Sequence, residues 1–233
     1  MKKLYAVIIA ISALSMGSQL IAGPFNPKPP APAPAPVVPA PVPELPALDE
    51  EGALDLSDRG LGDAGIIAVA PHFPQDMKDL ILDNNNIGPI GAEAIANNLF
   101  RAQDLNFITL RHNHIGVAGV RALVQNLPDG FVLLGLDDNN LGDAGALALA
   151  EHPLPRTLTV LSLDGNHIGN PGIIALAQHL QQNPIENFST LYLRNNEFGD
   201  EGKQALINAG YHEGEGAGGI WRKVPAAEAG QGH

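Results

Sequence analysis

Residues 161–176, LSLDGNHIGNPGIIAL, combine the signals of a short strand, a glycine-containing turn and the start of a helix. Leu161 and Leu163 are separated by one polar residue, which is the period of a strand. Asn170 stands at a typical helix N-cap position, and Pro171 suits the first helical residue because its φ is preset and it lacks an N–H. Phosphate-binding loops share this order of elements. They need a G-x-G doublet or a lysine followed by serine or threonine, and this stretch has neither.

Five other stretches of the chain repeat this pattern. The first inward apolar residues of the six copies are Leu54, Leu80, Ile108, Leu134, Leu161 and Leu191, at spacings of 26, 28, 26, 27 and 30 residues. A catalytic loop occurs once in a chain, whereas a structural unit recurs. Self-similarity at this period is typical of a solenoid, in which each unit buries its apolar face only against its neighbours.

Each position in the repeat has a physical role. A side-chain amide both donates and accepts, so stacked asparagines can satisfy the turn backbones of successive repeats. Five copies carry such a residue: Asn85, Asn113, Asn139, Asn166 and Asn196. Two glycines follow in every copy, where we expect a positive φ or a close approach of backbones. An alanine and an apolar residue come next, and we expect both to pack between the strand and the helix.

The consensus L-x-L-x-x-N-x-I-G-x-x-G-a-x-A-L resembles the leucine-rich repeat, specifically the subfamily of ribonuclease inhibitor and the Ran GTPase-activating proteins. The resemblance covers residues 51–210. It implies an α/β fold, a right-handed solenoid arc of about six strand–helix repeats with a parallel concave sheet and helices outside. Arg59 replaces the asparagine in the first copy and Glu51 replaces an apolar residue, so we interpret this copy as the N-terminal cap.

Residues 1–22 are interpreted as a cleaved secretory signal peptide. They carry two lysines, an apolar run from Leu4 to Leu14 and small residues near two cleavage points, after Gly17 and after Ala22. The run is short for a membrane span. We therefore expect a secreted or periplasmic protein of the bacterial envelope with no stable membrane span after cleavage; an uncleaved anchor is the alternative.

Residues 23–48 are interpreted as a Pro-rich linker, because residues 24–46 hold 11 prolines in 23 positions. Such a tract favours polyproline II at ~3.1 Å per residue, so its contour is roughly 70 Å. It suits a stiff spacer, and a ligand for a proline-binding module is the alternative. Residues 49–210 form the repeat domain. In residues 211–233, Tyr211 and Trp221 either cover the last repeat as a partial C-terminal cap or belong to a disordered tail.

The charge and the cysteine count restrict the partners. The formal net charge is −12, and it becomes −14 without Lys2 and Lys3. Such a chain repels nucleic acid and favours basic or neutral partners. The absence of cysteine rules out thiol nucleophiles and suits a bacterial exported protein better than a disulfide-capped ectodomain.

Polar residues that follow the inward leucines are the candidate partner-binding surface. Two columns of them are expected on the concave side, with neighbouring strands ~4.8 Å apart, so Arg111 stands between Asp83 and Asp137. They form either a self-neutralising charge ladder or a recognition surface. The candidate binding residues are Asp83, Arg111, His112, Asp137, Asp138, Asp164, Tyr192 and Arg194.

Neither a metal centre nor an active site is predicted. His112, His114 and His167 have suggestive positions, but two strands of separation is ~10 Å, too far for shared zinc ligation. No motif of a serine hydrolase, zinc protease or nucleotide-binding enzyme occurs. We predict a non-enzymatic, exported protein-binding module that acts as a monomer without a cofactor. The alternative is a secreted bacterial effector acting on a host protein, including a GTPase-related one.

Overall fold

The computed structural model describes residues 44–214 and 218–223. Within them, six strand–helix units follow one another, and two further strands complete the C-terminal end. The elements are β1 Ala53–Asp55, α1 Gly62–Val69, η1 Ala70–His72, β2 Asp79–Ile81, α2 Pro89–Ala96, η2 Leu99–Arg101, β3 Phe107–Thr109, α3 Gly116–Asn126, β4 Leu133–Gly135, α4 Gly142–Ala150, β5 Val160–Ser162, α5 Asn170–Gln182, β6 Thr190–Tyr192, α6 Asp200–Asn208, β7 Tyr211–Glu213 and β8 Ile220–Lys223.

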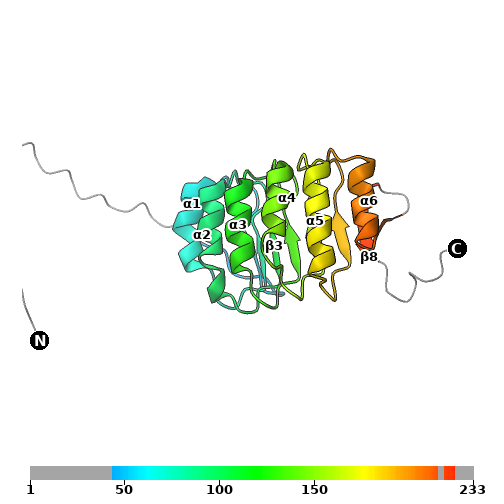
Figure 1. Cartoon of the computed structure of the whole chain (residues 1–233). Coiled ribbons are helices and arrows are strands. Elements are labelled where there is room, and N and C mark those ends of the chain that lie inside the picture. The colour runs from blue at the N-terminus through cyan, green and yellow to red at the C-terminus, as the bar shows by residue number, and fades with distance from the viewer. Residues whose placement is uncertain (1–43, 215–217, 224–233) are drawn as a thin grey trace, which may run out of the picture. The chain divides into compact units, whose positions relative to one another are not determined.

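The strands form one open sheet in the order β1-β2-β3-β4-β5-β6-β8-β7. Strands β1 to β6 are parallel, and β8 pairs antiparallel with both β6 and β7. Helices α1 to α6 stand side by side in chain order on one face of this sheet (Figure 1). The predicted fold class, an α/β solenoid of six repeats with a parallel sheet, is confirmed.

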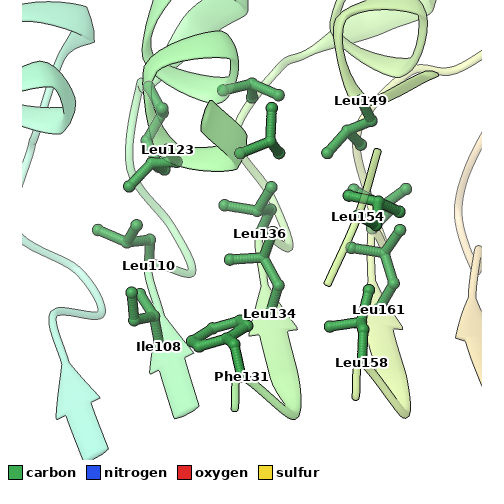
Figure 2. Packing of buried hydrophobic residues seen from close by; sticks show 14 of the residues in the cluster. Ile108, Leu110, Leu123, Phe131, Leu134, Leu136, Leu149, Leu154, Leu158 and Leu161 are labelled. Carbon is green, nitrogen blue, oxygen red and sulfur yellow. The ribbon is translucent and has the colours of Figure 1, made fainter. Parts of the chain in front are cut away.

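The core lies between the sheet and the helices. The middle residue of each parallel strand and the residue two places later are at most 1 % exposed, as in the pair Leu134 and Leu136. Leu123 of α3 and Leu149 of α4 extend from the helices toward the strand side chains (Figure 2). Each parallel strand has three residues, too few to stand alone, and the repeated burial holds them together.

The alanine column packs differently from the sequence prediction. Ala148 is buried, whereas its five equivalents are only half-buried. In the first five copies, the residue one place after the second glycine is buried against the sheet instead, for example Ala146, which is 0 % exposed. Ala146 and Leu149 are three residues apart, so their side chains lie on the same face of the helix. Ala148 is the sequence neighbour of Leu149, so its side chain is turned by about 100° around the helix axis.

The five asparagines form a buried ladder that links successive turns. In each, the amide nitrogen donates to a leucine carbonyl of the preceding repeat, as Asn139 Nδ2 does to Leu110 O at 2.8 Å. The amide oxygen accepts a backbone N–H from the preceding turn, as Asn139 Oδ1 does from Ile115 at 3.2 Å. Asn85, Asn113, Asn139 and Asn166 are at most 1 % exposed. Arg59 N–H donates to Asn85 Oδ1, so the first copy takes part as donor only.

Three helices receive their N-terminal cap from the repeat before them. Asp143, in the first turn of α4, accepts the N–H groups of Gly169 and Gly172 at the start of α5, at 2.8 and 3.0 Å. Asp63 caps α2 in the same way, and Asn170 caps α6. These contacts satisfy N–H groups that a helix terminus otherwise leaves unpaired.

The first glycine of the repeat adopts one of two conformations according to that cap. Where the preceding repeat supplies an aspartate or asparagine, the glycine is extended, as in Gly169 with φ −91°. Where Pro89 or Val117 stands at the capping position, the next glycine is left-handed, with φ 61° at Gly116 and 58° at Gly142. The expected positive φ therefore holds for part of the column only.

Replacing Asp143 with alanine is expected to lower the free energy of unfolding by about 1–2 kcal/mol, because two N–H groups of α5 lose their acceptor. Urea unfolding of the purified protein measures the change. The control is Asp200→Ala, which removes the equivalent aspartate of the last helix and should cost less than about 0.5 kcal/mol, since Asp200 is exposed. Equal costs for both variants would contradict the capping role.

Both ends of the core are covered. Leu45 and Leu48 pack against the core beside the first repeat. At the other end, Tyr211 of β7 and Trp221 of β8 are each 1 % exposed, and the Tyr211 ring meets Phe188 edge-on with centroids 5.9 Å apart. The antiparallel β8 thus ends the parallel stack by pairing with the open edge of β6.

The predictions for the two chain ends concern mostly residues that the structure does not describe. The signal peptide (residues 1–22), most of the Pro-rich linker (residues 23–43) and residues 224–233 lie outside the described residues. Among residues 44–214 and 218–223, the helices are too short or too polar to cross a lipid bilayer.

Candidate functional site

The face of the sheet opposite the helices presents three columns of side chains. Because side chains alternate along a strand, residues on either side of each buried middle leucine or isoleucine point away from the helices. The first residues of the strands are Ala53, Asp79, Phe107, Leu133, Val160 and Thr190, and the third residues are Asp55, Ile81, Thr109, Gly135, Ser162 and Tyr192. The column after the strands is Ser57, Asp83, Arg111, Asp137, Asp164 and Arg194.

The third column stays in register although the strands have ended. Backbone hydrogen bonds continue beyond each strand, for example from Asn84 N to Arg111 O and from His112 N to Asp137 O, at 2.8 and 2.9 Å. Neighbouring members are therefore one strand spacing apart. The three columns together carry five aspartates and two arginines, so this concave face is acidic.

A hollow of about 400 Å³ lies in the C-terminal half of this face. Its lining consists of Arg111, Leu133, Asp137, Val160, Ser162, Asp164, Tyr192 and Arg194. Gly135 lies close to one of these lining residues, since a Cβ atom there would lie 3.3 Å from Thr109 Cγ2 and 3.5 Å from Arg111 Nε. The hollow thus brings five of the eight predicted binding residues together with the apolar side chains of Leu133 and Val160.

Asp137 is the organising carboxylate of the hollow. It is 9 % exposed, its Oδ2 lies 2.9 Å from Arg111 Nε, and its Oδ1 accepts hydrogen bonds from Ser162 Oγ and from Asp164 N. These partners fix the Arg111 side chain across the neighbouring strand while leaving it 44 % exposed. A partly exposed arginine held in one orientation can bind a partner with little further loss of entropy.

Asp164 lacks an equivalent ion pair. Its Oδ1 accepts the N–H of Arg194 at 2.6 Å, but no basic side chain of the described residues comes within 4.0 Å of its carboxylate. Burial raises the pKa of Asp164, and the charges of Asp137 and Asp138 add to that increase, whereas the backbone N–H and the charge of Arg194 oppose it. The guanidinium of Arg194 lies instead above the ring of Tyr192, 5.8 Å from its centroid.

The other three predicted residues lie outside the hollow. Asp83 is half-buried after β2, one strand away from Arg111, and accepts the N–H of Arg111 at 2.9 Å. His112 and Asp138 lie in the turns that follow the strands, both with φ 53°, and form a pair with His112 Nδ1 and Asp138 Oδ2 3.4 Å apart. They belong to the rim of the concave face.

Within residues 44–214 and 218–223, no three histidine, aspartate or glutamate side chains gather closely enough to hold a metal ion. His167, the third candidate ligand, lies 2.7 Å from Glu197 across the next turn, Nδ1 to Oε1.

Comparison with known families agrees with the geometry. A family model described as leucine-rich repeat matches residues 74–96, 134–150, 155–177 and 186–206, within the second, fourth, fifth and sixth copies. The protein contains leucine-rich repeats. Leucine-rich-repeat proteins are typically non-enzymatic scaffolds for protein interaction, and no catalytic family matches. A search of curated proteins finds no relative of this chain.

Sequence reasoning missed the apolar half of the leucine-rich-repeat face. Phe107 is 39 % exposed at the start of β3, and it continues into Leu133 and Val160 on the next two strands. Each of these residues comes directly before the first inward apolar residue of its copy. The strand alternation that predicts an outward direction for the post-strand column predicts the same direction for them. An exposed row of apolar side chains beside charged ones is typical of interaction surfaces.

Proposed function

We propose that this leucine-rich-repeat protein is a non-enzymatic binding module that recognises a partner protein on its concave face. The observation that carries the proposal is the hollow between Arg111 and Arg194, where the apolar side chains of Leu133 and Val160 lie beside fixed charged groups. Interfaces use this combination, because apolar contact supplies affinity and oriented charges supply specificity.

The exposed sheet face itself supports the same function. Parallel sheets in proteins are usually covered by helices on both faces, whereas here the helices α1 to α6 of the described residues all lie on one face (Figure 1). The uncovered face carries Phe107, Leu133, Val160 and Tyr192 toward solvent, and a partner that buries them gains roughly 25 cal/mol for each Å² of apolar surface removed from water.

Three other grooves are weaker candidates. They measure about 370 to 480 Å³ and lie between the loops that follow the helices. Their linings are mainly proline, leucine, glutamine and asparagine, with Arg156, Asp129 and Glu186 as the charged members. None of these side chains is held by an ion pair like that of Arg111 and Asp137.

Replacing Arg111 with alanine is expected to weaken partner binding by about 1–2 kcal/mol, because arginines near the centre of an interface are often among its strongest contacts. Stability should change little, since a part-exposed ion pair contributes at most about 1 kcal/mol. Isothermal titration with the captured partner and urea unfolding measure the two effects. The control is Gln178→Ala on the exposed face of α5, which should alter neither.

The proposal includes export from the cytoplasm, supported by the basic and apolar composition of residues 1–22 ahead of the Pro-rich linker. Mass spectrometry of the protein isolated from its natural source should give an N-terminus near Ser18 or Gly23. Recovery of a soluble cytoplasmic form that still begins at Met1 would overturn the export proposal and leave the concave binding face unaffected.

A further inference from the structure

We infer that the hollow on the concave face receives a cationic side chain of the partner, an arginine or a lysine, with its charged end against the carboxylate of Asp164. This inference rests on the proposed function and specifies the chemistry of its partner.

Of the two carboxylates that line the hollow, Asp164 is the one without an ion pair among the described residues, and the guanidinium of Arg194 lies over Tyr192 instead of pairing with it. Asp137 has Arg111 at 2.9 Å and Ser162 Oγ as a further donor. Asp164 has only the backbone N–H of Arg194 on Oδ1, and its Oδ2 accepts no hydrogen bond from a described residue. A half-buried carboxylate in this position is stabilised by an added cation more than a fully hydrated one would be.

Negative charge also dominates the surroundings. Asp137 and Asp138 both act on Asp164, and Asp138 leans over Gly165, where its Oδ1 occupies the position that a side chain would need. The concave columns carry five aspartates against two arginines, and one of those arginines is already paired. The lining of the hollow itself has two aspartates and two arginines, and Asp138 beside it adds a third carboxylate. A cation entering next to Asp164 would reduce this local excess of negative charge, whereas an anion would increase it.

The shape of the hollow suits a long basic side chain. Leu133 and Val160 give the hollow an apolar part of its lining, and Tyr192 of β6 adds an aromatic ring. Lysine and arginine bury their alkyl stems on apolar surface while the charged end stays with polar groups. A bare metal ion fits less well, because no three carboxylate or imidazole groups of the described residues are gathered to ligate it.

The test uses two small probes that differ only in charge. Acetyl-arginine amide carries the guanidinium, and acetyl-citrulline amide has the same shape with a neutral urea. Each is titrated into the 15N-labelled full chain while backbone amide shifts are followed by NMR. The arginine probe is expected to shift the amides of Ser162, Asp164 and Arg194 in a saturable way and to bind about fivefold more tightly than the citrulline probe.

Two variants of the full chain sharpen the test. Asp164→Asn keeps an oxygen that can accept the N–H of Arg194 but removes the charge, so the arginine probe should bind it no better than the citrulline probe. Asp104→Asn makes the same change on an exposed loop residue outside the hollow and should leave the preference for arginine unchanged.

The outcomes separate this inference from the proposed function. Equal binding of the two probes, saturable shifts only outside the hollow, or an unchanged preference in Asp164→Asn would each overturn the cationic assignment. If a partner is still captured through the concave face in that case, the binding function stands without it. If the arginine probe binds selectively but the partner contacts another surface, the proposed function is wrong.

Discussion

Replacing Asn139 with alanine is expected to lower the free energy of unfolding by roughly 2–4 kcal/mol, because it leaves the buried Ile115 N–H without an acceptor, at about 1–3 kcal/mol, and removes further hydrogen bonds worth about 1 kcal/mol each. Asn139 is 1 % exposed. Its amide nitrogen donates to three carbonyls, those of Leu110, Leu136 and Asp137, at 2.8 to 3.1 Å. Its oxygen accepts from Ile115 N. Alanine removes all four bonds at the junction of two repeats, and urea unfolding monitored by circular dichroism measures the loss.

The matched control is Asn126→Ala on the exposed end of α3. Asn126 makes one hydrogen bond, from Nδ2 to Ala122 O, and it is solvated, so its loss should cost less than about 0.5 kcal/mol. A cost for Asn139→Ala as small as that of the control would mean that water replaces the ladder and that the asparagines do not link the repeats.

Replacing Trp221 with alanine is expected to cost about 3–5 kcal/mol, the range for removing a large buried aromatic side chain. Trp221 is 1 % exposed and packs at a tilt against Phe198, with ring centroids 6.4 Å apart. It also pairs with Leu191 through the antiparallel register of β8 and β6. Its loss should open the C-terminal end of the stack, so hydrogen exchange should accelerate in β6 and α6 before it does in β1 and β2.

Trp221→Phe separates packing from hydrogen bonding. Among the described residues, Trp221 Nε1 is buried without an acceptor, so phenylalanine removes an unpaired donor along with part of the ring. We expect this variant to cost clearly less than the alanine variant. If alanine costs no more than phenylalanine, or if exchange rises first at the N-terminal end, β7 and β8 do not cap the core.

The repeat architecture could be predicted because its determinants are local and recur six times. The inward leucines, the asparagine and the paired glycines each depend on contacts within one copy and its neighbour, so their spacing alone places them. The alanine column shows the limit of this reasoning. Alanine is small enough for both positions, the one that faces the sheet and the one two residues later. Only the orientation of the packed helix shows that Ala146, and not the column of Ala148, faces the sheet in most copies.

The candidate site could be predicted only in part. Five residues of the hollow follow from strand alternation, but their pairing does not. Arg111 has an aspartate on each side in its column. In the structure its guanidinium pairs with Asp137, and its backbone N–H donates to Asp83. The caps between repeats were also missed, since Asp143 lies 26 residues from Gly169 in the sequence and no local signal connects them.

Site-specific photo-crosslinking tests the binding of a partner on the concave face most directly. A benzophenone amino acid is placed at Tyr192 in the hollow, at Phe107 on the apolar row, or at Gln178 on the exposed face of α5. The protein is then irradiated among the cells or extract in which it naturally occurs. The concave positions should yield the same crosslinked partner, and Gln178 should yield none. A partner crosslinked from Gln178 and from neither concave position would contradict the account.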